Sequence, residues 1–185
     1  MLYVGCRDGY LYALDAVLGT LKWRFDAGGV SLEQSSPTIA GGFVYFGAWY
    51  NVPNFSEAGS FYKLDAQTGT LVWTALNNLG FSSSAFVHQD KVYVACDDLY
   101  FYALDAGTGA VLWRKYILPN RAGATVANDM VYIGGGGSGH IYAFDQNSGA
   151  ERWAFAVPGG LLTSSPCVVT QDGTVHHGGI SGAVN

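Results

Sequence analysis

The residues that could act as a nucleophile, a metal ligand or an acid–base pair are few and scattered along this 185-residue chain. Cys6, Cys96 and Cys167 are far apart in the sequence and form no CxxC pair, so we expect three unpaired thiols. His176 and His177 are neighbours in an expected strand, where adjacent side chains point to opposite faces. No carboxylates or histidines converge at a spacing typical of catalysis. We therefore predict no catalytic residue and no metal ligand.

A glycine-rich run at residues 134–139 has the composition of a phosphate-binding loop. Such a loop needs a helix N-terminus and usually a Lys-Ser or Lys-Thr pair, and neither follows the run. We interpret it as a turn. The chain carries nine Lys and Arg against fourteen Asp and Glu, has a formal net charge of −5 and contains no basic cluster, so we expect no nucleic-acid partner.

An insertion between two expected strands is the main binding candidate. It separates Tyr45 from Tyr62 by 17 positions, whereas the matching pair Tyr3 and Tyr12 is 9 positions apart. Loops on a rigid scaffold often carry function, and exposed Trp and Tyr are frequent anchors of interfaces. Either the insertion binds a partner or it folds over the hub of the fold and covers it. The binding residues predicted here are Trp49, Tyr50, Asn54 and Phe55.

A weaker binding candidate is the acidic pair Asp97 and Asp98, which occupies the same loop position in another part of the chain. Two adjacent charges in a loop are also typical of a solvated turn, so both interpretations stay open.

These candidates are positioned by a pattern that occurs four times. The sequence Tyr-Ala-Leu-Asp-Ala at residues 12–16 returns, with small changes, at 62–66, 102–106 and 142–146. In each copy a Gly follows the Asp by four residues and a Trp follows it by eight. The recurring residues are the aspartates Asp15, Asp65, Asp105 and Asp145, the glycines Gly19, Gly69, Gly109 and Gly149, and the tryptophans Trp23, Trp73, Trp113 and Trp153.

A Val-Tyr run precedes each copy, and a segment rich in Ser and Thr precedes that run in most copies. All these segments are short, rich in β-branched and aromatic residues, and bounded by turn pairs such as Gly41-Gly42. Four short antiparallel strands every 40 to 50 residues are typical of a β-propeller blade. We name the strands A to D from hub to rim: the Ser-rich segment is A, the Val-Tyr run B, the Tyr-Ala-Leu-Asp run C and the Trp-bearing run D.

The recurring residues have structural explanations. The Asp side chain can accept hydrogen bonds from the backbone of the C–D turn, and the Gly supplies a positive φ. The Trp is a large flat group suited to packing against a neighbouring blade. A catalytic site rarely recurs four times in register, so we assign all twelve residues a structural role.

We expect one all-β propeller domain over residues 1–185 with about four blades. Three blade units span about 35–75, 82–115 and 122–155, and a fourth combines 2–25 with 162–178. The chain would then be a small closed or partial propeller, part of a larger ring in a longer chain, or one of two copies that complete a larger ring. The longest uncharged stretches are interrupted by Gly, Ser, Asn or Pro, so we expect no transmembrane segment; no signal peptide is recognisable at the N-terminus.

The pattern Tyr-Ala-Leu-Asp-Ala, x-x-Gly-x-x-x-Trp resembles the pyrroloquinoline-quinone (PQQ)-like repeat family, over nearly the whole chain. Its members include quinoprotein alcohol dehydrogenases, the envelope lipoprotein that assists outer-membrane protein assembly, and sensor domains attached to bacterial kinases. The resemblance implies that the Trp docks one blade on the next and that complete rings have seven or eight blades, so that the four blades here would be half of an eight-bladed ring. It also implies that the compartment is the periplasm or cell envelope.

From the resemblance we expect a non-enzymatic interaction scaffold for a protein or peptide partner, in envelope protein assembly, with no cofactor. The alternatives are a fragment of a quinoprotein dehydrogenase, which would hold PQQ with calcium in the ring's central channel, and a ligand-sensing domain of a larger signalling protein. The dehydrogenase is disfavoured because the chain lacks an adjacent cysteine pair and a calcium-ligand cluster.

Overall fold

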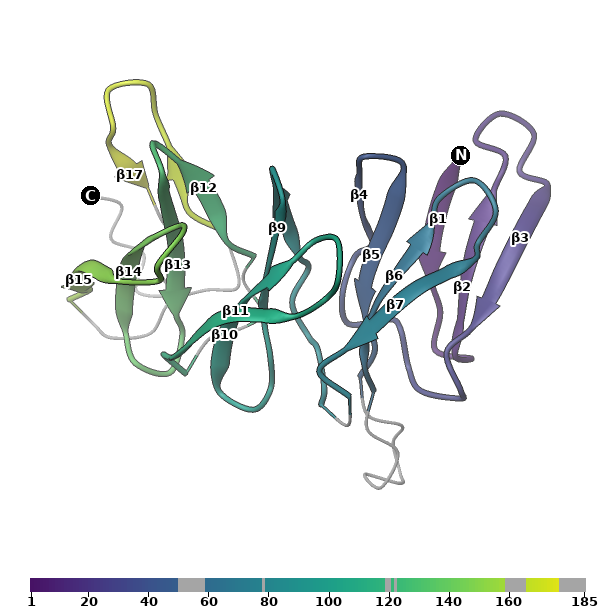
Figure 1. Cartoon of the computed structure of the whole chain (residues 1–185), viewed down its shortest axis with the longest axis horizontal. Helices are drawn as coiled ribbons and strands as arrows, with labels where there is room; N and C mark the ends of the chain where they lie inside the picture. Colours follow the sequence, from purple (N-terminus) through teal and green to yellow (C-terminus); the bar gives the residue numbers. More distant parts are fainter. Residues whose placement is uncertain (50–58, 78, 119–120, 122, 159–165, 177–185) are drawn as a thin grey trace. The chain divides into compact units, whose positions relative to one another are not determined.

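The computed structural model describes residues 1–49, 59–77, 79–118, 121, 123–158 and 166–176 (Figure 1). Throughout these ranges the regular secondary structure consists of β-strands, and no helix occurs. Each multi-stranded sheet is an antiparallel meander in chain order. The all-β fold of propeller-type blades predicted from the repeat is therefore confirmed.

The chain divides into two compact units, Met1–Ala85 and Phe86–Asn185. The first unit holds two sheets. One consists of β1 (Leu2–Gly5), β2 (Tyr10–Leu14) and β3 (Leu21–Asp26), which are strands B, C and D of the first blade. The other consists of all four strands, β4 (Thr38–Ala40), β5 (Phe43–Gly47), β6 (Phe61–Asp65) and β7 (Leu71–Ala75).

The second unit holds two four-stranded sheets and a short hairpin. The third sheet contains β8 (Phe86–His88), β9 (Lys91–Ala95), β10 (Tyr100–Asp105) and β11 (Val111–Tyr116). The fourth contains β12 (Thr125–Ala127), β13 (Met130–Gly135), β14 (His140–Asp145) and β15 (Glu151–Ala156). The hairpin pairs β16 (Val168–Val169) with β17 (Val175–His176).

Each unit has a core between its sheets, built from the alternating inward residues of the strands. In the first unit, Leu11 of the first sheet packs with Val44, Phe46 and Leu64 of the second, and all four are at most 2% exposed. In the second unit, a matching cluster joins the third and fourth sheets; its members include Tyr93, Phe101, Trp113, Val131, Ile133 and Phe144.

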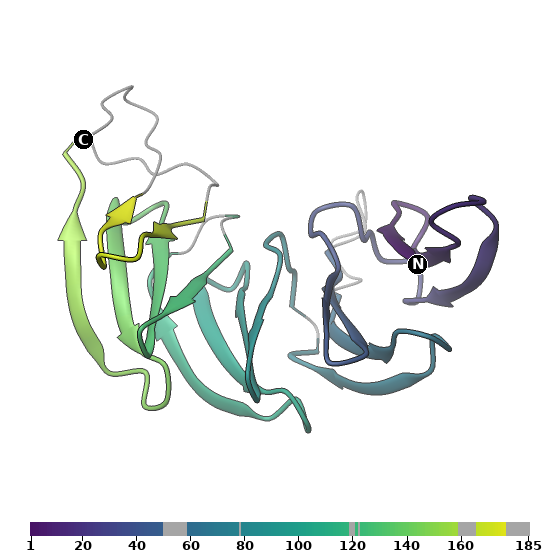
Figure 2. The same ribbon diagram turned by 90° about the horizontal axis from the view of Figure 1, so that it is seen from above.

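The hairpin β16–β17 lies beside strand β12 in the second unit (Figure 2). The Thr125 hydroxyl donates a hydrogen bond to the Cys167 carbonyl at 2.5 Å, and the buried Cys167 packs with Tyr132 and Ala143 of the fourth sheet. The hairpin thus supplies strands A and B of a further blade. In the structure β16 pairs with β17 and β1 pairs with β2, so the combination of 2–25 with 162–178 in one blade stays a prediction.

Every C–D hairpin contains a β-bulge at the same position. In each hairpin, the residue of strand D directly before the Trp has no opposite residue in strand C. These four bulge residues are Lys22, Val72, Leu112 and Arg152. A bulge increases the local twist of the strand. The bulge therefore belongs to the repeat, like the turn that precedes it.

All three cysteines are free, as expected from their spacing. No helix in the described ranges is long and apolar enough to span a bilayer.

Candidate interaction surface

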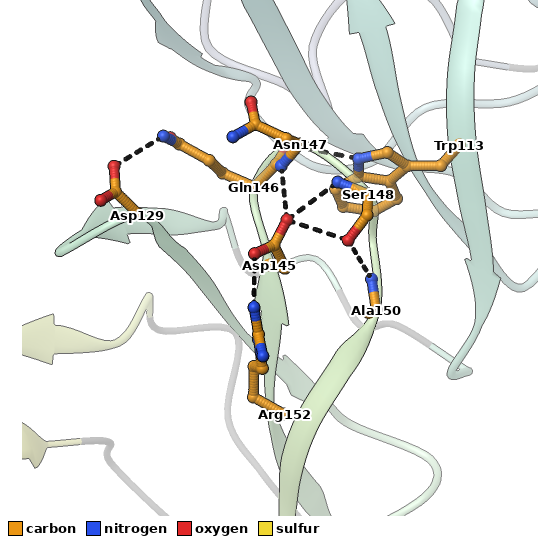
Figure 3. Close-up of polar contacts among 8 residues, drawn as sticks. All are labelled: Trp113, Asp129, Asp145, Gln146, Asn147, Ser148, Ala150 and Arg152. Atoms are coloured by element: carbon orange, nitrogen blue, oxygen red, sulfur yellow. Dashed lines mark hydrogen bonds and ion pairs between the residues drawn. The ribbon is translucent and has the colours of Figure 1, made fainter.

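The C–D turn of the fourth sheet shows how the recurring aspartates are used (Figure 3). Asp145 Oδ1 accepts hydrogen bonds from the Ser148 backbone N–H at 2.9 Å, the Ser148 hydroxyl at 2.9 Å and the Asn147 N–H at 3.1 Å. Its Oδ2 accepts from Arg152 Nη2 at 2.8 Å. Since the bulge places Arg152 beside the turn, both carboxylate oxygens of Asp145 have partners.

The other turns have the same geometry. Asp15 Oδ1 accepts from the N–H groups of Val17 and Leu18, both at 2.9 Å, and Lys22 lies 3.1 Å from Oδ2. These backbone hydrogen bonds, together with the lysine, lower the pKa of Asp15 to about 2. Backbone and hydroxyl donors likewise lower the pKa of Asp65, Asp105 and Asp145. A carboxylate with so low a pKa is a weak base, so the turn aspartates are unsuited to proton transfer near neutral pH.

Two of the four recurring tryptophans, Trp23 and Trp113, dock on a neighbouring turn of the same unit. Trp23 Nε1 donates to the Ala66 carbonyl at 3.2 Å, and Trp113 Nε1 donates to the Gln146 carbonyl at 3.3 Å. The indole lies flat on the glycine of that turn: a Cβ at Gly69 would come within 2.7 Å of the Trp23 ring, and one at Gly149 within 2.7 Å of the Trp113 ring. Glycine is needed there for this close approach as well as for its positive φ.

Trp153 differs from the other described tryptophans. It is 39% exposed, whereas Trp73 is 9% and Trp113 is 8% exposed. The ring has Tyr132 beside it, at 5.9 Å between centroids. In the described ranges no blade follows the fourth sheet with its own C–D turn, so the repeat supplies a tryptophan here without the turn that would cover it.

The B–C loops lie at the opposite end of the sheets, and in the first and third sheets they are held by an aspartate. Asp98 accepts from the Tyr100 N–H at 3.0 Å and from the Tyr102 hydroxyl at 2.5 Å. Asp8 accepts in the same way from Tyr10 at 3.0 Å and Tyr12 at 2.6 Å. Burial, together with the Asp98 carboxylate, raises the pKa of Tyr102 to about 12. Asp98, predicted as a binding residue, is thus engaged within its own loop.

The structure describes only two of the other predicted binding residues, Trp49 and Asp97. Trp49 is half-buried, and its backbone N–H donates to the Ser31 carbonyl at 2.8 Å. Asp97 is half-buried beside Asp98. Tyr50, Asn54 and Phe55 lie outside the described residues. The structure therefore brings none of these predicted residues into a shared site among those it describes, and the binding roles of the insertion and of the acidic pair stay predictions.

A tyrosine–arginine pair lies next to Asp98, and a matching pair lies next to Asp8. Neither pair was predicted from the sequence. The Arg114 guanidinium lies 4.6 Å from the centroid of the Tyr100 ring, and the Arg24 guanidinium lies 4.7 Å from that of Tyr10. Tyr116 packs edge-on against Tyr100 at 5.4 Å and is 57% exposed. The signal in the sequence was the recurrence of Asp-x-Tyr-x-Tyr and Trp-Arg in the first and third copies. We call Tyr100, Arg114 and Tyr116 the Tyr–Arg patch.

Other chemical candidates gain no support from the geometry. Among the described residues, no three His, Cys, Asp or Glu side chains gather as they would around a metal ion. The glycine-rich run forms a tight turn in which the Gly139 N–H donates to the Gly135 carbonyl at 2.9 Å. A depression of about 760 Å³ in the first unit is bordered by Lys22, Trp23, Asp65 and Ala66 and lies where Trp23 docks.

Comparisons with known proteins agree with this architecture. A family model described as outer membrane protein assembly factor BamB matches residues 1–121 and 98–179. A search of the curated proteins finds no match.

Solved structures share the fold at low identity. BamB from Moraxella catarrhalis has a TM-score of 0.76 and 20% identity over 97% of this chain and 52% of its own. The computationally designed protein Ika8 has a TM-score of 0.74 and 15% identity over 98% of this chain and 53% of its own. Quinohemoprotein alcohol dehydrogenase from Comamonas testosteroni has a TM-score of 0.67 and 19% identity over 95% and 37% of the two chains.

The chain thus spans about half the length of the BamB structure. At these identities the solved structures establish the fold alone, whereas the family match extends over nearly all of the sequence. With its four copies of the repeat, its propeller-type blades and this match, the chain belongs to the PQQ-like repeat family described as outer membrane protein assembly factor BamB.

Proposed function

We propose that this chain is a non-enzymatic scaffold that binds a protein or peptide partner through the B–C end of its sheets. The observation that carries the proposal is the Tyr–Arg patch, in which Arg114 stacks on Tyr100 beside the exposed Tyr116. Tyr and Arg are enriched among the residues that contribute most to binding at protein interfaces. The finer proposal, suggested by the family's description, is a role in protein assembly in the cell envelope.

The patch is prepared for binding before a partner arrives. The Asp98 carboxylate fixes the loop and the Tyr102 ring, and Tyr102 lies at 6.2 Å from Tyr100. Arg114 is held over the Tyr100 ring by a cation–π contact, which limits the conformational entropy that its side chain would lose on binding. A partner with a carboxylate or a backbone carbonyl could accept hydrogen bonds from the guanidinium while an apolar side chain packs on Tyr116.

The proposal includes no resident cofactor. The similarity to the quinohemoprotein alcohol dehydrogenase is one of fold, over 37% of that protein's chain. The carboxylates of the turn aspartates Asp15 and Asp145 accept hydrogen bonds within their own turns. We therefore propose neither quinone nor calcium binding.

Site-specific photo-crosslinking tests the proposal. A photoreactive phenylalanine analogue is placed at Tyr116 in the chain expressed in bacterial envelopes, and a matched control carries it at Glu151, which is exposed near the C–D end. We expect a discrete protein adduct from position 116 that is lost when Arg114 is changed to Ala. Adducts of equal yield from both positions, or none from position 116, would contradict the assignment of the patch.

A further inference from the structure

Leu99 has a backbone conformation that is unusual for its residue type. It lies in the B–C loop of the third sheet, directly before Tyr100 of the Tyr–Arg patch, and has a φ of 76°. The same position in the first and fourth copies of the repeat is Gly9, with a φ of 89°, and Gly139, with a φ of 66°. Glycine adopts a positive φ freely, whereas a bulky side chain is strained there. The third copy therefore carries a side chain that its backbone disfavours.

Burial in the core does not explain the Leu99 side chain, which is 41% exposed. Leu118 also has a positive φ, 48°, but it is half-buried on the glycine-rich turn of the fourth sheet. There its Cβ would stand 3.3 Å from a Cβ added at Gly137. Packing thus offsets the strain at Leu118. Strained residues that the core does not require are concentrated at binding and catalytic sites, so the strain at Leu99 points to function.

Backbone hydrogen bonds hold Leu99 beside the Tyr–Arg patch. Its carbonyl accepts from the N–H groups of Ile117 and Leu118, both at 3.3 Å. Leu99 is therefore next to Tyr100 in the chain and is bonded to the residue that follows Tyr116. Since Tyr116 is 57% exposed, these two side chains add exposed apolar surface to the B–C end of the third sheet.

The third copy also differs from the first in the charge near its arginine. Strand D of the first copy carries Asp26 two residues after Arg24, on the same face of the strand. Strand D of the third copy carries Tyr116 two residues after Arg114. Among the described residues, Arg114 forms no ion pair with a carboxylate. A carboxylate from a partner could therefore form a charge-assisted hydrogen bond with this guanidinium, next to apolar surface.

From these observations we infer that the Tyr–Arg patch, extended by Leu99, binds a peptide segment in which an apolar side chain stands next to an Asp or Glu. The apolar side chain packs on Leu99 and Tyr116, and the carboxylate accepts hydrogen bonds from the Arg114 guanidinium. The inference rests on the proposed function, because it names the peptide chemistry that the patch recognises. It adds Leu99 to the site as the residue that selects the apolar side chain.

An array of immobilised peptides tests the inference with the whole chain, residues 1–185. Each peptide consists of Ser and Thr around one central pair, which is Phe-Asp, Phe-Asn, Ala-Asp or Ala-Asn, in either order. The Phe-Asp peptides should bind at least about fivefold more tightly in Kd than the Ala-Asp peptides, and by a similar factor more tightly than the Phe-Asn peptides. These factors are the scale of one apolar contact and of one charge-assisted hydrogen bond.

Substitutions assign the two preferences to separate residues. Leu99→Asn removes the apolar group, and asparagine tolerates a positive φ. This variant should lose the preference for Phe over Ala, keep that for Asp over Asn, and raise the urea midpoint of unfolding by about 0.5 M because strain is relieved. Leu99→Met should keep both preferences, and Arg114→Met should lose only that for Asp. Leu76→Asn is the matched control: Leu76 also has a positive φ, 52°, but lies in the first unit, so both preferences should persist.

The outcomes separate this inference from the proposed function. A preference for Phe that persists in Leu99→Asn, or that is lost equally in Leu76→Asn, would overturn the role of Leu99 and leave the proposed function standing. A lowered urea midpoint in Leu99→Asn would show that the fold requires the leucine, and would also overturn it. If the original chain showed neither preference, the inference would fail, whereas photo-crosslinking from position 116 would still decide the proposed function.

Discussion

Trp113 and Trp153 occupy the same position in two consecutive sheets of one unit, yet one is buried and the other is 39% exposed. The first lies on Gly149 and donates to the Gln146 carbonyl. The second follows the same Asp-x-x-x-Gly turn in its own sheet but is covered by no further turn among the described residues. The repeat therefore determines which side chain is present and how its own turn is closed, while the neighbouring blade determines what that side chain contributes to stability.

The largest expected effect tests this difference directly. Trp113→Ala should lower the free energy of unfolding by about 3–5 kcal/mol, since it leaves a cavity against Phe101 and Phe144. Trp153→Ala should cost about 1 kcal/mol because a large part of the ring already contacts water. Urea unfolding followed by far-UV circular dichroism measures both. Equal losses of unfolding free energy in the two variants would show that the neighbouring sheet does not determine what the tryptophan contributes to stability.

A smaller effect is expected at the glycines beneath the two tryptophans. Gly149→Ala combines a positive φ of 67° with a Cβ that would stand 2.7 Å from the Trp113 ring. We expect it to cost about 2–3 kcal/mol, since overpacking is added to backbone strain. Gly19→Ala has nearly the same φ, 68°, and a Cβ there would meet nothing within 4 Å, so this variant should cost only the backbone strain, about 1 kcal/mol.

The same unfolding experiment decides the glycine prediction, with Gly41→Ala as a second strain-only control. If Gly19→Ala lowered the free energy of unfolding as much as Gly149→Ala does, the indole over Gly149 would not explain the expected difference between the two turns.

The smallest difference is expected between the turns of Asp15 and Asp145, in how each contributes to the pH dependence of stability. The folded-state pKa values of Asp15 and Asp145 are both lowered by donors within the turn, whether or not a tryptophan covers it. A carboxyl group with a lowered pKa stabilises the fold above its unfolded pKa of about 3.9, and this stabilisation is lost as the pH falls through the folded pKa. Stability should therefore be flat from neutral pH to about pH 5 and decline between about pH 4 and about pH 2.

Asn substitutions measure that decline one turn at a time. Asp15→Asn and Asp145→Asn keep an acceptor oxygen but cannot titrate, so each should make the acid limb of the urea midpoint shallower by a similar amount. A much larger change for the covered turn would show that docking, and not only the local donors, sets the carboxyl pKa.

Most of the fold could be predicted because it depends on local features. The Tyr-Ala-Leu-Asp run, the turn glycine and the strand-D tryptophan fix strand order and turn type within about a dozen residues each, and β10 with β11 shows the expected pairing. The exposure of Trp153 could not be predicted in this way, since it depends on whether another blade packs on the fourth sheet. The Tyr–Arg patch was missed because Arg114 and Tyr100 are brought together by the pairing of two strands.

The candidate site was harder to predict for a related reason. A loop aspartate such as Asp98 is a residue type that often binds partners. In the structure, however, its carboxylate accepts a hydrogen bond from the Tyr102 hydroxyl four positions later. Sequence reasoning assigned the acidic pair by residue type, whereas the side-chain partners depend on the loop conformation. The insertion's Tyr50, Asn54 and Phe55 lie outside the described residues, and their role stays a prediction.

The C–D turn has a consequence for how the chain folds as it leaves the ribosome. Asp145 binds donors no more than seven residues away, and the Gly149 N–H returns to the Asp145 carbonyl at 2.9 Å. Such a hairpin can close as soon as its own residues have emerged, without distant partners. Within each unit, the later sheet then provides the surface on which the tryptophan of the earlier sheet packs, so each unit can consolidate one meander at a time as the nascent chain emerges.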